Sequence, residues 1–265
     1  MEKWKIGGFD SGKGGTVIFK EIKKLLPEAE YFYIADTKNC PYGEKSDDEL
    51  WEIVTGHVEK LKKWGADVIV IACNTATTRC IEKLRKQYPD LNFVGTEPAI
   101  RLATKSGAKK VLVMATPGTI RSERMTKLLI ENQKAGQKVE LLSCEGLADA
   151  IETDQGIDEK LKELLKGARR DFDAVVLGCT HYTLIKNRLQ NFFPKAILVD
   201  GNFAVTKRVL FILRGVIGDV FSVAPDHDKH HGCFIDKTNE YRTEDERKEK
   251  GQNSVSAVTE EGERK

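Results

Sequence analysis

The apolar residues of the chain alternate between two patterns. Short apolar runs such as "KIGGFD" and "DVIVIAC" have the length of buried strands, whereas longer stretches such as "DELWEIVTGHVEKLKKWG" carry apolar residues at helical spacing. Strands that alternate with helices in this way are typical of βαβ units around a mostly parallel sheet. The pattern therefore predicts an α/β fold.

A second series of strands and helices follows the first. The strand from Lys5 to Asp10 matches a strand that starts at Lys110, and residues 67–73 match residues 173–179, at shifts of 105 or 106 residues. A near-constant shift indicates an internal duplication, although a chance likeness between two βαβ series is the alternative. We therefore predict two duplicated α/β units with mostly parallel sheets and a functional site at their interface.

Two of the predicted strands end on a thiol. Cys73 follows "VIVIA" and Cys179 follows "VVLG", and small polar residues come after both. Ligands of open α/β sheets bind at the carboxyl ends of strands, where the N-terminus of the next helix attracts a carboxylate and lowers a thiol pKa below about 8.5. We therefore expect both thiols to ionise readily beside a small anionic ligand.

Two bases on opposite sides of one carbon atom can invert it. One thiolate removes a proton from a carbon beside a carboxylate, and the other thiol returns a proton to the far face. A free cysteine is more commonly a small buried apolar side chain, and we prefer that interpretation for Cys80, Cys144 and Cys233. The positions of Cys73 and Cys179 at strand ends favour the chemical role.

Composition narrows the class of protein. Lys and Arg number 43 against 41 Asp and Glu, and no basic block occurs, so we expect no nucleic-acid partner. The sequence shows no signal peptide and no run of about 18 apolar residues, which predicts a cytoplasmic protein without a membrane partner. Six cysteines are too sparse for a disulfide scaffold and form no paired-cysteine zinc motif.

Two other kinds of site have weaker support. The segment from Gly7 to Lys13 has the G-x-x-x-x-G-K spacing of a nucleotide-binding P-loop. However, Gly14 stands where a Ser or Thr should hold magnesium, and Asp10 places a carboxylate among the phosphates. The run "DHDKHHGC" at residues 226–233 carries metal-binding side chains but is more typical of a solvated loop. We therefore expect neither a nucleotide nor a metal.

Five short motifs carry a resemblance to a known family. "FDSGKGG", "CPYGEKS", "ACNTAT", "ATPGT" and "GCTHY" occur in this order across roughly residues 5–212. Together they resemble the cofactor-independent aspartate/glutamate racemase superfamily, and its glutamate-specific members most closely. The resemblance implies two-base chemistry without pyridoxal phosphate, flavin or metal. Lys13 departs from the apolar residue that is usual in the first motif.

The resemblance also implies roles for individual residues. The catalytic thiols would be Cys73 and Cys179, assisted by Asp10, His181 and the more loosely matched Glu152. The implied substrate-binding residues are Asp10, Ser11, Pro41, Tyr42, Gly43, Asn74, Thr75, Thr180 and His181, and the duplication adds Thr116 as the counterpart of Ser11. Asn74 and Thr75 have an alternative role as simple helix caps.

Chains of this superfamily usually return to their first unit near the C-terminus. This implies a first unit of residues 1–96 with 207–235, and a second unit of residues 97–206. Residues 236–265 contain 4 apolar residues against 16 charged ones. Such a composition predicts a polar, disordered tail.

The resulting hypothesis is the interconversion of L- and D-glutamate by two cysteines, which would supply D-glutamate for peptidoglycan. Another amino-acid racemase of the same superfamily, such as one for aspartate, is an alternative because one sequence does not define the side chain accepted. A catalytically silent amino-acid-binding protein on the same fold is the second alternative. The expected partner is a small amino acid, and the sequence leaves a homodimer open.

Overall fold

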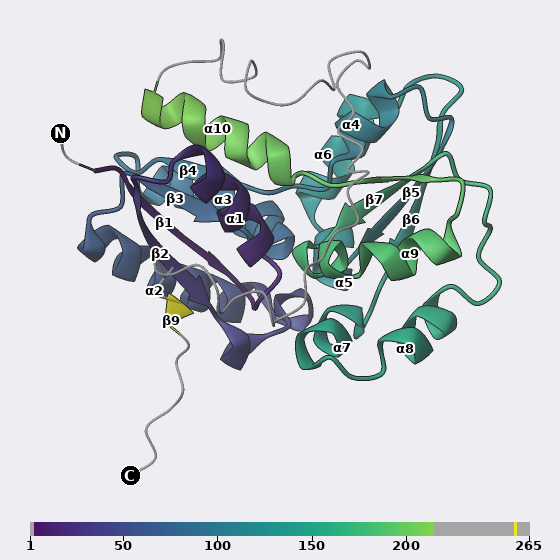
Figure 1. Cartoon of the computed structure of the whole chain (residues 1–265), viewed down its shortest axis with the longest axis horizontal. Helices are drawn as coiled ribbons and strands as arrows, with labels where there is room; N and C mark the ends of the chain where they lie inside the picture. Colours follow the sequence, from purple (N-terminus) through teal and green to yellow (C-terminus); the bar gives the residue numbers. More distant parts are fainter. Residues whose placement is uncertain (1–2, 215–256, 259–265) are drawn as a thin grey trace, which may run out of the picture.

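The strands form two sheets, and every described strand pair is parallel. The computed structural model describes residues 3–214 and 257–258. The first sheet has the order β4 (Phe93–Gly95), β3 (Val68–Ile71), β1 (Lys5–Asp10), β2 (Glu30–Ala35) and β9 (Ala257–Val258). The second has the order β6 (Lys138–Ser143), β5 (Lys110–Ala115), β7 (Ala174–Gly178) and β8 (Ile197–Val199). The sheets lie side by side as the centres of two units (Figure 1), which confirms the predicted α/β fold.

Helices cover both faces of each sheet (Figure 1). In the first unit, α1 (Thr16–Leu25) and α10 (Asn202–Arg214) pack on one face, and α2 (Asp47–Trp64) and α3 (Asn74–Gln87) pack on the other. In the second unit, α4 (Ile100–Lys105) and α6 (Glu123–Asn132) lie opposite α7 (Leu147–Thr153), α8 (Ile157–Leu164) and α9 (Lys186–Phe192). Short turns follow several strands: η1 (Thr37–Asn39), η2 (Tyr42–Glu44), α5 (Pro117–Ile120) and η3 (Thr180–Ile185).

Local sequence explains these elements. All residues of the central strands β3 and β7 are buried, because helices cover both sheet faces, and such strands are continuously apolar. Helix α2 begins with a capping box in which Ser46 and Glu49 bond to each other's backbone amides. It ends at Gly65, whose left-handed conformation is cheapest for glycine.

The two units share one topology. Their strand orders, β2-β1-β3-β4 and β6-β5-β7-β8, are equivalent. The pairing of Ile6 with Val68 in the first sheet recurs as the pairing of Val111 with Ala174 in the second, at the shifts of 105 and 106 residues seen in the sequence. The structure therefore has the arrangement that an internal duplication predicts.

An equivalent hydrogen bond also recurs at the start of the central strands. In the first unit, Asp67 Oδ2 accepts from the Lys5 amide at 2.7 Å. In the second unit, Asp173 Oδ2 accepts from the Lys110 amide at 2.9 Å. The same residue types thus join the same strand ends in both halves.

The helix α10 returns the chain to the first unit. Its buried residues Val205, Val209 and Leu210 belong to the same apolar core as Ile6 of β1 and Ile18 of α1. Because Val205 already packs in this core, we propose that the crossover lies between β8 and α10 rather than at residue 207. The rest of the predicted returning segment, residues 215–235, lies outside the described residues.

The structure describes two residues of the tail that the sequence predicts to be disordered. Residues Ala257–Val258 form β9, which pairs in parallel with Tyr33 and Ile34 of β2. These two residues join the first sheet, and the disordered tail stays a prediction. The other residues of 236–265, and the His-rich run at 226–233, lie outside the described part of the chain.

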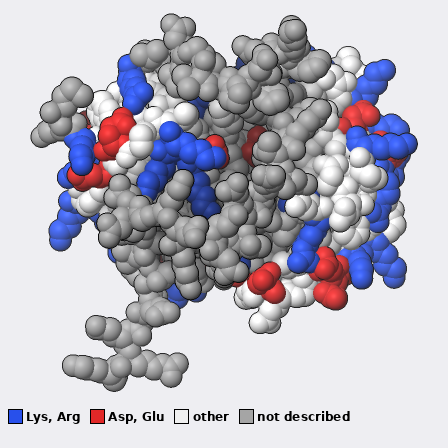
Figure 2. Space-filling model, viewed as in Figure 1, with Lys and Arg blue, Asp and Glu red and all other residues white. Residues whose placement is uncertain are grey.

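The coloured residues on the face in Figure 2 show no single dominant charge. In the view of Figure 2, the coloured Lys and Arg side chains lie among Asp and Glu side chains, as the formal net charge of +2 leads one to expect. Within residues 3–214 and 257–258, no helix is long and apolar enough to cross a membrane.

Because α10 packs on the first unit, its buried residues should stabilise the fold. Replacing Leu210, which is 4% exposed, by alanine should lower the free energy of unfolding by about 2–4 kcal/mol, because it leaves a cavity in the first core. Urea unfolding measures this. The exposed neighbour Arg208 is the control, and Arg208→Ala should change stability by less than about 0.5 kcal/mol. Equal effects of the two changes would show that α10 does not complete this core.

Candidate active site

The carboxyl ends of strands from both units meet at one seam. Asp10 ends β1, and Thr116 directly follows β5. Cys73 lies between β3 and α3, and Cys179 lies between β7 and η3. The two thiol residues are only 5% and 7% exposed, so the protein encloses both of them.

The side chain of Asp10 joins the two units. Its carboxylate accepts from the amides of Ser11 at 2.8 Å and Gly15 at 2.5 Å, and from Thr180 Oγ1 of the second unit at 3.0 Å. Burial raises the pKa of Asp10, and the neighbouring His181 and these hydrogen bonds offset the rise only in part. The carboxylate also fills the loop in which a P-loop would hold phosphate, which disfavours nucleotide binding.

Cys73 has its partners in the first unit. Its Sγ lies 3.9 Å from Ser11 Oγ, to which it donates a weak hydrogen bond. Burial, followed by the charge of Asp10, raises the pKa of the Cys73 thiol, while hydrogen bonds from Ser11 and the Ala76 amide lower it. The net shift is upward, so burial in the closed structure favours the thiol form.

Cys179 has a different set of partners. Its Sγ lies 3.7 Å from His181 Nδ1, and His181 Nε2 lies 2.8 Å from Glu152 Oε2. Burial raises the pKa of Glu152, but hydrogen bonds from His181 and the Lys13 amide outweigh it and bring the pKa below its ordinary value. The second thiol is thus linked through an imidazole to a carboxylate on α7.

The expectation that both thiols have lowered pKa values is wrong for this enclosed site. Burial raises the pKa of Cys179 well above its ordinary value, and the charges of Cys73 and Asp10 raise it further. Loss of water around the sulfur atoms outweighs the amides at the start of the following elements. Cys179 is also followed by the short turn η3 rather than by an α-helix.

Three comparisons with known proteins bear on this geometry. The family model described as Asp/Glu/Hydantoin racemase matches residues 16–209. The chain is 37% identical to a glutamate racemase of Clostridium botulinum, over 77% of this chain and 81% of that protein. It is 39% identical to a glutamate racemase of Leptospira interrogans, over 79% of this chain and 82% of that protein.

A solved structure has the same fold. It is the Escherichia coli glutamate racemase in complex with L-glutamate and the activator UDP-MurNAc-Ala, which matches with a TM-score of 0.72 and 31% identity over 80% of this chain and 82% of that chain. The chain belongs to the aspartate/glutamate/hydantoin racemase family. The predicted enzyme class, an amino-acid racemase and hence an isomerase, is confirmed by these matches.

Lys13, which departs from the usual motif, ties the loop after β1 of this racemase to the second unit. Its amide donates to Glu152 Oε2 at 3.0 Å and its Nζ donates to the Glu152 carbonyl at 2.9 Å. Close by, a Cβ atom on Gly14 would lie 2.6 Å from the His181 amide nitrogen. A glycine at this position therefore allows the backbones of the two units to touch.

The hydroxyl groups of three threonines meet across the seam. Thr75 Oγ1 of α3 lies 2.8 Å from Thr116 Oγ1 and 3.2 Å from Thr119 Oγ1 of α5. Asn74 Nδ2 donates to the carbonyl of Thr96 at 3.4 Å. Neither Asn74 nor Thr75 caps its own helix with its side chain in this state, so the capping alternative is not what the structure shows.

The segment of Pro41, Tyr42 and Gly43 lies at the seam, but its residues have different contacts. Pro41 and Gly43 line a cavity of about 10 Å³ together with Thr116. The Tyr42 side chain is buried, and its hydroxyl donates to Asp36 Oδ2 at 2.7 Å instead. The Tyr42 phenol therefore points away from this cavity and into the core of the first unit.

The cavity at the seam has room for about one water molecule. Its lining does not include Cys73 or Cys179, which are themselves almost completely buried, so the described structure encloses both thiols. Contacts such as Asp10–Thr180 and Lys13–Glu152 hold the two units together at this closed seam.

A buried network that the sequence did not reveal lies behind Tyr42. His57 Nε2 lies 3.0 Å from Asp36 Oδ2 and 3.2 Å from the Tyr42 hydroxyl, and Asn39 also donates to Asp36. Burial raises the pKa of Asp36, but the hydrogen bonds from His57, Tyr42 and Asn39 bring it below its ordinary value. Asp36 therefore stabilises the fold as a carboxylate.

This network predicts the effect of Tyr42→Phe. Loss of the hydroxyl donor should lower the free energy of unfolding by about 1–3 kcal/mol at pH 7, with little change in substrate KM. The folded pKa of Asp36 is lowered, so its stabilisation is present above the unfolded pKa of about 3.9 and is lost as pH falls through the folded value. The difference between variant and wild type in chemical denaturation should shrink accordingly below about pH 4. A pH-independent difference would contradict this.

Proposed function

We propose that the enzyme interconverts L- and D-glutamate by a two-base mechanism in which Cys73 and Cys179 are the bases. The observation that carries the proposal is that these thiols end equivalent strands of two duplicated units and lie enclosed at one seam. Charge on Cys73 affects the pKa of Cys179, as expected of sulfur atoms that share one small site. The relatives named glutamate racemase support glutamate as the substrate.

In each turnover the α-carbon loses one proton and gains another on its opposite face. For one enantiomer, a thiolate takes the α-proton, and the electron pair of the broken C–H bond stays on the carbon and its carboxylate. The opposite thiol breaks its S–H bond and gives its proton to the other face of that carbon. The enzyme then holds the first sulfur protonated and the second as thiolate, which is the state ready for the opposite enantiomer.

The partners of the two thiols then have distinct roles. Asp10 and Ser11 assist Cys73, while His181 and Glu152 assist Cys179. Each pair takes a proton from its thiol or gives one to it and exchanges that proton with water, which restores the starting state after a turnover. A carboxylate on one side and an imidazole–carboxylate pair on the other make the two half-sites chemically unequal.

Substrate binding also supplies a positive charge that favours ionisation of the buried thiols. Burial and the charge of Asp10 disfavour a thiolate at Cys73. A glutamate brings an α-ammonium group into the same enclosed space, and a positive charge within a few ångströms favours the thiolate. The amides and hydroxyls of Ser11, Asn74, Thr75 and Thr180 are the donors available for its carboxylates.

The product D-glutamate would serve peptidoglycan synthesis. This role is supported by the relatives' activity rather than by any residue of the chain. Complementation of a bacterial strain that requires D-glutamate tests it. Growth without added D-glutamate is the expected result, and a cytoplasmic location stays a prediction from the sequence.

The first experiment is incubation of the purified protein with L-glutamate in deuterium oxide. Proton NMR should show loss of the α-proton signal while the optical rotation falls towards zero, without added cofactor. L-aspartate in a parallel sample tests the alternative substrate. Binding of glutamate without exchange or racemisation would instead identify a silent binding protein.

Replacement of either proposed base tests the mechanism. Cys73→Ala and Cys179→Ala should each lower kcat by about 10³-fold or more, because inversion needs both bases. Cys80, a buried cysteine on α3, is the matched control. Cys80→Ala should retain most of the activity, and an equal loss in all three variants would point to damaged folding.

Replacement of Glu152 tests the second half-site. Glu152→Gln removes the charge that holds His181 and should lower kcat by about 10–10³-fold without lowering the melting temperature to the same degree as a core mutation. The exposed Glu159 on α8 provides the matched control. Unchanged activity of Glu152→Gln would exclude the proposed relay.

A further inference from the structure

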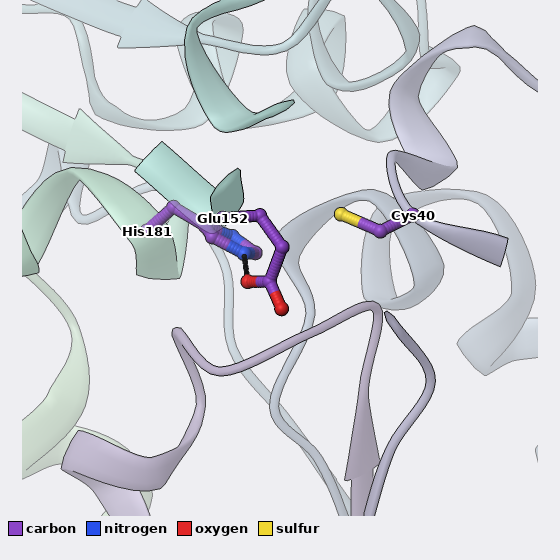
Figure 3. A group of neighbouring side chains, drawn as sticks. All are labelled: Cys40, Glu152 and His181. Carbon is purple, nitrogen blue, oxygen red and sulfur yellow. Dashed lines mark hydrogen bonds and ion pairs between the residues drawn. The ribbon is translucent and has the colours of Figure 1, made fainter. Parts of the chain in front are cut away.

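Three side chains with metal-binding atoms converge at the seam from both units. Cys40 follows η1 in the first unit, whereas Glu152 lies on α7 and His181 on η3 in the second. One ligand atom from each lies within 4.8 Å of the other two. Figure 3 shows the Cys40 sulfur pointing towards the Glu152 carboxylate, which in turn contacts the His181 ring.

The donor set suits a particular class of cation. A thiolate, an imidazole and a carboxylate together are typical ligands of zinc, while magnesium and calcium prefer oxygen atoms alone. Zinc binds sulfur at about 2.3 Å and nitrogen or oxygen at about 2.0–2.2 Å. Tetrahedral ligand atoms then lie roughly 3.3–3.6 Å apart, so side-chain shifts of about 1 Å bring these three into range.

The three side chains differ in burial: Cys40 is partly exposed, Glu152 is mostly buried and His181 is fully buried. Cys73 and Cys179 are more buried than Cys40. His181 and Glu152 are bonded to each other at 2.8 Å, so a cation has to replace that hydrogen bond. It can do so without losing the position of the imidazole, because the other ring nitrogen, Nδ1, contacts Cys179.

We propose that Cys40, Glu152 and His181 form a binding site for Zn²⁺ or a similar divalent cation, which bridges the two units. The site departs from the expectation, drawn from sequence, that the chain has no metal site. Its ligands come from both sides of the seam, so the cation holds the closed state. It also replaces the hydrogen bond between His181 Nε2 and Glu152, so on the proposed function this pair no longer exchanges protons with Cys179 and racemisation is inhibited.

Cobalt(II) provides a readout that needs no turnover. A thiolate ligand to Co²⁺ gives a charge-transfer absorption band in the near ultraviolet, and tetrahedral Co²⁺ gives visible bands. Untagged full-length protein at about pH 8 should develop both bands with one equivalent of Co²⁺. Addition of Zn²⁺ should abolish them, and a large excess of Mg²⁺ should not.

The Cys40→Ser variant tests the site directly. It should lose the charge-transfer band and bind Zn²⁺ at least about tenfold more weakly, as measured by competition with a chromophoric chelator. Cys144, a buried cysteine of the second unit, gives the matched control, and Cys144→Ser should keep both properties. Thermal melting shows whether each variant is folded.

A second variant tests whether residues 226–233, rather than the proposed site, bind the cobalt. The full-length chain with His227, His230 and His231 changed to alanine and Cys233 to serine should keep the cobalt bands. Bands that persist in Cys40→Ser, or that disappear in this four-residue variant, would overturn the proposal. Absence of any band in the wild type would overturn it as well.

The inhibition is measured separately. Zn²⁺ should lower the rate of wild-type racemisation, and the concentration for half inhibition should rise at least about tenfold in Cys40→Ser, with each rate expressed relative to the same protein without metal. Inhibition that is equal in both proteins would overturn the bridging role. A protein without racemase activity would still show the cobalt bands, so failure of the proposed function is distinguishable from failure of the metal site.

Discussion

The closed site depends on one buried carboxylate, that of Asp10. A charge that is fully enclosed is costly unless hydrogen bonds replace its water, and Asp10 has four donors: two amides of its own loop, the Ser11 hydroxyl and Thr180 of the other unit. One of these bonds crosses the seam, so the solvation of this charge is complete only when the units are together. The same charge raises the pKa of Cys73. Closure and thiol reactivity are therefore coupled through a single residue.

Those parts of the site that depend on local sequence could be predicted. The length of each apolar run indicated buried strands, and the strand ends then located Cys73 and Cys179, since carboxyl ends of parallel strands share one edge of a sheet. The constant shift between the halves predicted the matching strand orders, because a duplicated chain folds twice in the same way. The motif match also predicted a catalytic role for Glu152, although the alignment around it was loose. In the structure Glu152 contacts His181.

The rest depends on contacts between distant parts of the chain. Nothing in "CPYGEKS" shows that the Tyr42 phenol turns towards Asp36 and His57 or that the Cys40 thiol faces α7. The Lys13–Glu152 contact joins residues 139 positions apart. The pKa of each thiol follows from how completely two units enclose it, and a helix start next to the thiol is a weaker influence than that burial. Side-chain direction and desolvation are properties of the assembled seam.

The close approach at Gly14 and Gly43 has a consequence for mutational tolerance. A Cβ on Gly14 would meet the backbone of His181, and one on Gly43 would lie 2.7 Å from Thr116 Cβ. In a saturation mutagenesis screen scored by growth or activity, both positions would rank with the catalytic residues, although a glycine has no group that moves a proton. Depletion at these positions would report how closely the chain packs against a backbone at Gly14 and against a side chain at Gly43. The essential residues found in such a screen therefore fall into two groups. One group takes part in the reaction, and the other is essential because its small size allows the two units to pack together.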